Sequence, residues 1–222
     1  MLVLMTLKMP LPPIEEQRRI AAILDKADAI RRKREQALAL ADDFLRVTFL
    51  DMFGDPMTNP KGWATAPLGG SVKSIESGWS AKGENRKAEQ GEKGVLKISA
   101  VTSGHYLPSE NKFVEKIPAR KKLIFPQKGD LLFSRANTRE LVAATCIVET
   151  NNESTFLPDK LWRINVRKEF ITTEYLKCLL SHAQVRSRLC QNSSYRKWNY
   201  RSEDCKWLSY YGMLPPIQGV VL

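Results

Sequence analysis

The residues best suited to chemistry in this chain are polar and basic side chains in predicted loops. One cluster separates two predicted strands, 130–134 and 141–148, and it comprises Arg135, Asn137, Thr138 and Arg139. A guanidinium group donates two parallel hydrogen bonds to guanine, and a carboxamide pairs in the same way with adenine. The cluster therefore has side chains that read base edges in nucleic acid, although an ordinary solvated turn has the same composition.

Three other segments have a similar character. Lys160 and Arg163 flank Trp162, and we interpret the tryptophan as a core residue and the cations as phosphate contacts. A second loop places polar and aromatic residues around Gly78, namely Ser77, Trp79 and Ser80. A third loop, 190–200, contributes Ser193, Ser194, Tyr195, Arg196, Lys197 and Asn199. The run 120–122 is interpreted as solvated and is left outside this set.

Enzyme signatures are missing from the sequence. It has no GxxxxGK[ST] phosphate loop, no GxGxxG and no Asn/Asp-Pro-Pro-Tyr/Phe tetrapeptide. Pro158-Asp159 resembles the opening of a nuclease PD…(D/E)xK pattern, but the acid-x-Lys that follows, at 204–206, is distant. The four cysteines form no CxxC pair and the two histidines no HxxxH pair. We therefore expect no catalytic residue, no metal and no cofactor.

The net charge of +11 is concentrated in one part of the chain. Residues 14–53 hold eight basic and eight acidic residues, whereas 54–222 hold 26 basic and 16 acidic residues, a balance of +10. A basic excess confined to the globular part favours a polyanionic partner, most often nucleic acid, against the alternative of a basic, soluble surface.

Residues 1–7 are apolar but too short to span a bilayer, so we expect a cytoplasmic protein with reduced thiols and no membrane contact.

A long helix is predicted over 14–53. Pro12-Pro13 and Glu15-Glu16 suit a helix start, and no proline or glycine follows until Gly54. Heptad-like spacing predicts a seam for a partner helix. The seam positions are Ile20, Leu24, Ala27, Arg31, Arg34, Leu38, Ala41 and Leu45. The two arginines interrupt the apolar pattern, either as a solvated face or as residues that fix register.

The remainder predicts an α+β architecture, with the long coiled-coil-like helix followed by a mixed α/β domain. We expect an extended linker over 57–70, then strands over 95–101, 123–125, 130–134, 141–148 and 161–166, and a helix capped by Thr172. In domain terms, 1–13 is the tail of a preceding domain, 14–53 the helix, 54–211 the binding domain and 212–222 the start of a second helical region.

Several motifs are recognisable as a set. Residues 11–15 (LPPIE) recur as 214–218 (LPPIQ), which indicates a duplication at the scale of a domain. Residues 11–25 (LPPIEEQRRIAAILD), 52–63 (MFGDPMTNPKGW), 129–137 (GDLLFSRAN) and 158–163 (PDKLWR) resemble the specificity subunits of type I restriction–modification systems. The resemblance covers most of the chain, in the family's order, but with one target-recognition domain where the family has two.

This resemblance implies a non-enzymatic subunit that binds one half of a bipartite site in double-stranded DNA. It also implies conserved helices that space two recognition domains and dock methyltransferase (M) and restriction (R) subunits. For a half-length chain we expect a homodimer through the long helix. Two alternatives remain open: the specificity part of a fused single-chain (type IIG) restriction enzyme, and a helical dimerisation or antirestriction protein without a DNA role. The basic domain argues against an antirestriction mimic, which would be acidic.

Overall fold

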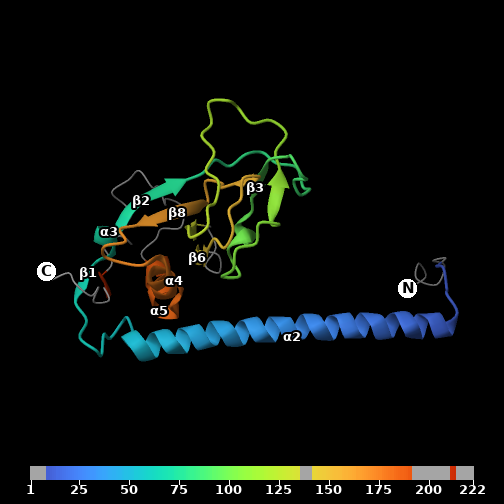
Figure 1. Cartoon of the computed structure of the whole chain (residues 1–222), viewed down its shortest axis with the longest axis horizontal. Helices are drawn as coiled ribbons and strands as arrows, with labels where there is room; N and C mark the ends of the chain where they lie inside the picture. The colour runs from blue at the N-terminus through green and yellow to red at the C-terminus, as the bar shows by residue number, and fades with distance from the viewer. Residues whose placement is uncertain (1–8, 136–141, 192–210, 214–222) are drawn as a thin grey trace. The chain divides into compact units, whose positions relative to one another are not determined.

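The structure is a computed structural model that describes residues 9–135, 142–191 and 211–213, with only the backbone described at 190, 191 and 211–213. The chain divides into two compact units, Met1–Thr48 and Phe49–Leu222. Their contents confirm the predicted fold class, a long helix followed by a mixed domain of strands and helices (Figure 1). No helix in the described ranges is long and apolar enough to cross a membrane.

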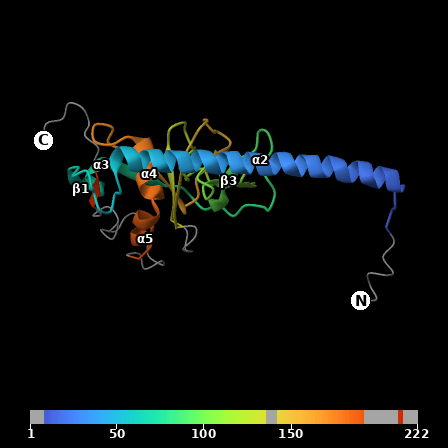
Figure 2. The same cartoon turned by 90° about the horizontal axis from the view of Figure 1, so that it is seen from below.

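Helix α2, Ile14–Phe53, forms nearly all of the described part of the first unit. It begins where the proline pair predicts, with Gln17 N donating to Pro13 O at 3.1 Å, and acidic residues lie in its first turn. Its 40 residues form one uninterrupted rod (Figure 2) of roughly 60 Å at ~1.5 Å per residue.

Large apolar side chains on this helix are exposed to solvent. At the predicted seam, Ile20 is 42%, Leu24 62%, Leu38 53% and Leu45 52% exposed. Polar positions form ion pairs one turn apart, and Arg31, at a seam position, pairs with Asp28 and Glu35. Exposed pairs of this kind add about 0.3–0.5 kcal/mol each, so they support the helix without covering its apolar face.

The segment after α2 was expected to be an extended linker, and this expectation is wrong. Gly54, at φ 82°, ends the helix by donating from its N–H to Leu50 O at 2.8 Å. Residues 56–58 and 60–61 form turns, and Lys61 Nζ donates to Met52 O at 3.0 Å. Trp63 Nε1 donates to Phe53 O at 2.8 Å. These donors satisfy carbonyls at the helix end, so the motif at 52–63 is a compact helix terminus.

The last turn of α2 packs inside the second unit, which therefore begins at Phe49 rather than after Phe53. Phe49, Phe53 and Tyr175 form an aromatic trio with ring centroids 5.0–5.3 Å apart. Because these rings are in mutual contact, the end of the helix is part of the domain core.

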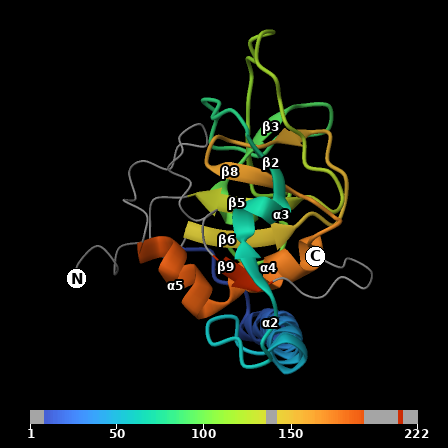
Figure 3. The ribbon, with the colours of Figure 1, turned by 90° about the vertical axis from the view of Figure 1, so that its left-hand side faces the viewer.

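A four-stranded antiparallel sheet forms the centre of the second unit (Figure 3), with the order β2-β8-β5-β6. The strands are β2 (Val72–Ser77), β5 (Leu131–Arg135), β6 (Val142–Ile147) and β8 (Leu161–Val166). Alternation predicts the last three within one residue at each end. Strand β2 was not predicted, because it is an edge strand with polar residues at four of its six positions.

Each face of this sheet is covered by a separate apolar core. Trp162 is fully buried on one face, as predicted, and packs with Phe133 and with α4 (Thr173–Ser181) and α5 (Ala183–Gln191). On the other face Leu132, Leu161 and Cys146 pack with residues from 96 to 124 and with Leu157. Burial raises the pKa of the Cys146 thiol to about 12, so it behaves as an apolar core group. The predicted cap of α4 is confirmed, because Thr172 accepts from Tyr175 N at 3.2 Å.

Two smaller sheets complete the unit. One has the order β4 (Asn111–Phe113), β3 (Gly94–Leu96) and β7 (Thr155–Phe156), and the other pairs β1 (Thr65–Pro67) with β9 (Tyr211–Met213). A short helix, α3 (Leu68–Ser71), precedes β2. The strand expected over 95–101 ends at Leu96 and becomes a 3₁₀ turn, Ile98–Ala100, and the strand expected over 123–125 is wrong because that segment forms no ladder.

Candidate nucleic-acid interface

The ends of three strands meet at one edge of the four-stranded sheet. Strand β2 ends at Ser77 and β5 ends at Arg135, whereas β8, antiparallel to both, begins at Leu161. Ser77 pairs in register with Trp162, and Ser134 with Leu161. The register therefore brings Ser77, Arg135 and Lys160 to the same edge, although the sequence separates them by up to 83 positions.

Asp159 lies at the centre of this edge. Its backbone carbonyl accepts from Ser77 Oγ at 3.1 Å and from Arg135 Nε at 2.8 Å. Its carboxylate accepts from Ser80 Oγ and from Arg135 Nη2, the latter at 3.1 Å. Arg135 also donates from its backbone N–H to Lys160 O at 3.0 Å. These hydrogen bonds join three segments, and we call Ser77, Ser80, Arg135, Asp159 and Lys160 the strand-end cluster.

The Gly78 loop approaches the chain just before Asp159 very closely. A Cβ atom at Gly78 would lie 1.8 Å from Leu157 O, and that carbonyl accepts from Trp79 N at 3.0 Å. Only glycine permits this approach, because any side chain would displace the Leu157 backbone. The Trp79 ring stacks on Phe156 with centroids 6.0 Å apart and is half-buried.

We expect Gly78→Ala to lower the free energy of unfolding by about 1–3 kcal/mol, because the methyl group overlaps Leu157 O and breaks its bond to Trp79 N. Gly70→Ala is the matched control, since a Cβ there meets nothing within 4 Å, and it should change stability by less than about 0.5 kcal/mol. Urea unfolding of both variants measures the difference. Equal stability of the two would contradict the close approach.

Arg163 does not join the strand-end cluster. Its side chain is 19% exposed and forms ion pairs with Glu76 at 2.7 Å and Asp130 at 3.2 Å. Burial by itself would raise the pKa of Glu76, but hydrogen bonds from Asn165 and Arg163 outweigh it and hold that pKa below its ordinary value. Arg163 therefore links β8 to β2 and to the residue just before β5. It is not part of the strand-end cluster.

The other predicted contacts lie outside the described residues. These are Asn137, Thr138 and Arg139 after β5, and Ser193, Ser194, Tyr195, Arg196, Lys197 and Asn199 after α5. They remain predictions. In the sequence, one residue separates Arg135 from Asn137.

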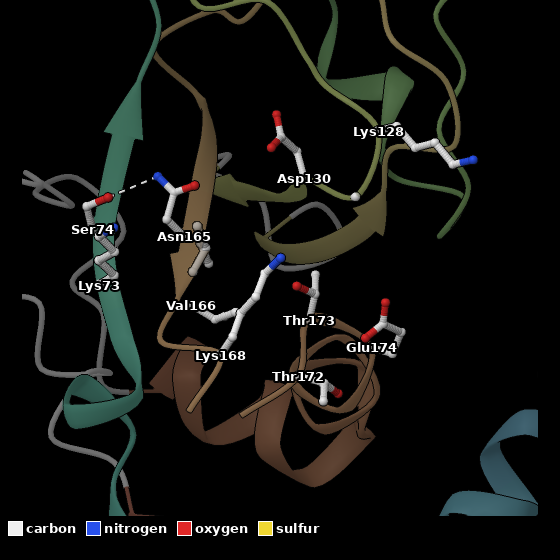
Figure 4. A pocket seen from close by; sticks show the side chains of 12 residues that line it. Lys73, Ser74, Lys128, Asp130, Asn165, Val166, Lys168, Thr172, Thr173 and Glu174 are labelled. Atoms are coloured by element: carbon white, nitrogen blue, oxygen red, sulfur yellow. Dashed lines mark hydrogen bonds between the residues drawn. The ribbon is translucent and has the colours of Figure 1, made fainter. Parts of the chain in front are cut away.

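A pocket of ≈ 600 Å³ lies at the opposite end of the strands, where β2 begins and β8 ends (Figure 4). Lys73, Lys168, Asp130 and Glu174 are among its lining residues, so its charge is mixed. Asn165 donates to Ser74 Oγ at 2.9 Å across one wall. Lys128 points away from the other lining side chains (Figure 4). This mixture has no arrangement that favours one ligand class.

The Asp159 carboxylate acts as a hydrogen-bond acceptor within the strand-end cluster. A nuclease carboxylate must hold a metal ion, whereas the Asp159 carboxylate accepts from a guanidinium group and a hydroxyl group. Among the residues that the structure describes, no group of three or more His, Cys, Asp or Glu could hold a metal. The Pro158-Asp159 sequence is therefore explained by its hydrogen bonds to neighbouring segments.

Sequence reasoning missed the two residues that organise this edge. The sequence identifies Asp159 only as part of a possible nuclease pattern and of the motif at 158–163, and Gly78 only as the centre of a loop. The adjacency of proline, aspartate and lysine at 158–160 was the available signal, because an acid beside a cation before a buried strand suits a fixed turn. Its partners lie 24 and 79 residues away, at Arg135 and Ser80, which no local pattern reveals.

Comparison with known proteins gives two curated relatives from Escherichia coli. The type I restriction enzyme EcoEI specificity subunit is 28% identical over 127 residues, which are 57% of this chain and 21% of that protein. The EcoKI specificity subunit, from strain K12, is 25% identical over 96% of this chain and 48% of that protein. The chain thus spans about half the length of the longer-matched relative.

A solved structure described as showing complex assembly and conformational transition of the type I R-M system contains a chain with the same fold. The match has a TM-score of 0.50 at 20% identity and covers 94% of this chain and 50% of that chain. No protein-family model matches the sequence. The motifs, the fold and both curated relatives agree that the chain is similar to the specificity subunits of type I restriction enzymes, over 48% of the length of one relative and 21% of the other.

Proposed function

We propose that this chain is a DNA-recognition module that binds one half of a bipartite target within a type I restriction–modification complex. The observation that carries the proposal is the convergence of separately predicted contact residues at one edge of the sheet. Ser77, Ser80, Arg135 and Lys160 come from three segments, and all of them contact Asp159 or adjoin it.

The charge distribution supports a polyanionic partner. The balance of +10 belongs to residues 54–222, whereas the residues of α2 are balanced. Lys160 is exposed at the strand-end cluster, where a phosphate would be attracted to it. A protein that neutralises phosphates with lysine and arginine gains affinity by releasing counterions, so the basic domain suits duplex binding.

Within the cluster we assign different roles to the two cations. Lys160 contacts phosphate, and Arg135 presents its guanidinium group to a base edge, with Asn137, Thr138 and Arg139 extending that contact. The two bonds from Arg135 to Asp159 support this assignment, because a fixed guanidinium group loses less conformational entropy when it binds. The chain itself binds DNA, and the partner subunits carry out the chemistry.

Two conservative substitutions should separate these roles. Arg135→Lys keeps the charge but removes the bidentate donor pair, so binding to the preferred duplex should weaken by ~1–3 kcal/mol while binding to scrambled duplexes stays unchanged. Lys160→Gln should weaken binding to every duplex and lower the salt slope of log affinity by ~1. Fluorescence anisotropy against salt concentration measures both effects.

Lys168→Gln is the control for charge, since this exposed lysine lies beyond the other end of β8 and should leave the salt slope unchanged. The preferred duplex comes from selection out of a randomised pool. Parallel losses for Arg135→Lys and Lys160→Gln on both duplexes would contradict the assignment.

We further propose that α2 pairs with a partner helix. Large apolar side chains are exposed along the rod, among them Leu24, Leu38 and Leu45. Their exposure favours a partner helix that covers them rather than a helix that stays in solvent. An antiparallel pair with a second copy would put two recognition domains at opposite ends of the rods, which restores the two-domain organisation of full-length specificity subunits. The same rods would then offer a docking surface to methyltransferase subunits.

A further inference from the structure

The segment between β4 and β5, 114–130, contains the run Arg120, Lys121 and Lys122, which sequence reasoning set aside as solvated. Figure 3 shows this yellow-green segment projecting from the domain. All three side chains are exposed. Pro118 O accepts from Lys121 N at 2.9 Å, so the run lies at a turn rather than in an open chain.

Apolar anchors hold this turn beside the strand-end cluster. Ile117 and Leu123, on either side of the run, pack against the same small core as Trp79. That core includes Phe156, on which Trp79 stacks. Because both flanks of the turn are anchored on one core, its three cations have a restricted position.

The backbone of Leu157 joins the two loops directly. Its N–H donates to Ile124 O at 2.9 Å, and its carbonyl accepts from Trp79 N at 3.0 Å. Two residues later the chain reaches Asp159, the centre of the strand-end cluster. One short stretch, Leu157–Asp159, therefore positions the turn that carries Arg120, Lys121 and Lys122, the Gly78 loop and the strand-end cluster.

The cations of this turn, which lies next to Trp79, are suited to contact with a phosphate backbone. The Nζ of Lys121 lies 5.7 Å from the centroid of the Trp79 ring, a distance typical of a cation–π contact. Asp159 forms an ion pair with Arg135, whereas the three cationic side chains of the turn are exposed to solvent. Arginine and lysine side chains contact phosphate oxygens in protein–DNA complexes, and clusters of exposed cations mark such surfaces.

We propose that Arg120, Lys121 and Lys122 form a phosphate-contacting arm that continues the DNA interface from the strand-end cluster across Trp79. The proposal rests on the proposed function, since it extends the same interface. The arm binds the backbone of a duplex whose bases face the cluster. It contributes affinity for any duplex sequence and no discrimination between sequences, because phosphates are the same at every position.

The test compares two triple variants of the full chain. In the arm variant Arg120, Lys121 and Lys122 are replaced by glutamine. In the control variant Lys73, Arg167 and Lys168 are replaced by glutamine. This removes the same charge from exposed positions near the start of β2 and just after β8, at the end of the sheet away from the strand-end cluster. Circular dichroism and thermal melting establish that both remain folded. Binding to a duplex of random sequence is then measured against salt concentration.

We expect the arm variant to lower the salt slope by ~2–3, about 0.9 for each phosphate that a cation no longer neutralises, and the control variant to lower it by less than ~1. On a selected duplex, the arm variant should weaken binding by the same factor as on the random duplex. Equal slopes for the two variants, or weaker binding to the selected duplex alone, would overturn the arm. Failure of the wild-type chain to bind any duplex would overturn the proposed function itself, and with it the arm.

Discussion

Replacing Leu24 and Leu38 by aspartate should convert an associating chain into monomers. Both side chains are more than half exposed on α2, although each has the size of a core residue. In a paired helix each would be buried, and losing one buried leucine costs about 2–5 kcal/mol. Two losses, with two charges introduced into an apolar seam, should raise the dissociation constant more than ~1,000-fold. Light scattering over a concentration series measures the mass directly.

A control with the same charge change is available on the opposite face of the helix. Ala22→Asp and Gln36→Asp have the same spacing of 14 residues and lie away from the seam. This control should keep the mass of the wild-type chain. If the seam variant also keeps that mass, or if both pairs of substitutions give monomers, then the seam is not the pairing surface.

Replacing Asp159 by alanine should weaken specific DNA binding without weakening non-specific binding. The carboxylate repels phosphates, so its loss should leave binding to scrambled duplexes unchanged or modestly tighter. It also holds Arg135 through Nη2, so its loss should weaken binding to the selected duplex by ~1–3 kcal/mol, or about 5–150-fold. Anisotropy titrations on both duplexes measure the two effects.

Glu115→Ala, which removes an exposed acid elsewhere in the domain, is the control for charge alone and should affect both duplexes equally. A loss of affinity for Asp159→Ala that is equal on both duplexes would indicate general damage to the fold. Tighter binding to both duplexes would show that Arg135 needs no anchor. Either result would remove Asp159 from its positioning role.

The helix was predictable because its signals are local. The proline pair before Ile14, the acids at Glu15 and Glu16 and the glycine after Phe53 each act within one turn. The role of the segment after Phe53 was not predictable, because Lys61 and Trp63 satisfy carbonyls nine or ten residues back in the chain. A composition rich in proline and glycine describes a linker and a capped terminus equally well.

The central strands were predictable where alternation or continuous burial marks them, as in 131–135 and 161–166. Strand β2 was missed because only Val72 and Ile75 are apolar among its six residues, and its register shifts between Val72 and Ser74. An edge strand with one neighbour needs little apolar surface, so its pattern is weak. The segment 123–125 has strand-like residues, but they anchor a turn on a core instead of joining a ladder.

The candidate site was predictable in its residue types but not in its organisation. Arg135, Ser77, Ser80 and Lys160 are identified by polarity and by their place next to predicted strands. These residues share one edge because of the antiparallel register of β2, β8 and β5. Patterns in a single sequence do not reveal this register. The ion pairs of Arg135 with Asp159 and of Arg163 with Glu76 also join residues far apart in the sequence, so local patterns around the two arginines do not predict them.

Selection from a randomised duplex pool is the sharpest test of whether this chain reads DNA sequence. The full chain is bound to the pool at physiological salt, alone and with a methyltransferase subunit, and the retained duplexes are sequenced over successive rounds. We expect enrichment of one short motif, with enrichment reduced by Arg135→Lys and nearly unaffected by Lys168→Gln. Retention of duplexes without an enriched motif, or no retention at all, would contradict sequence recognition by this chain.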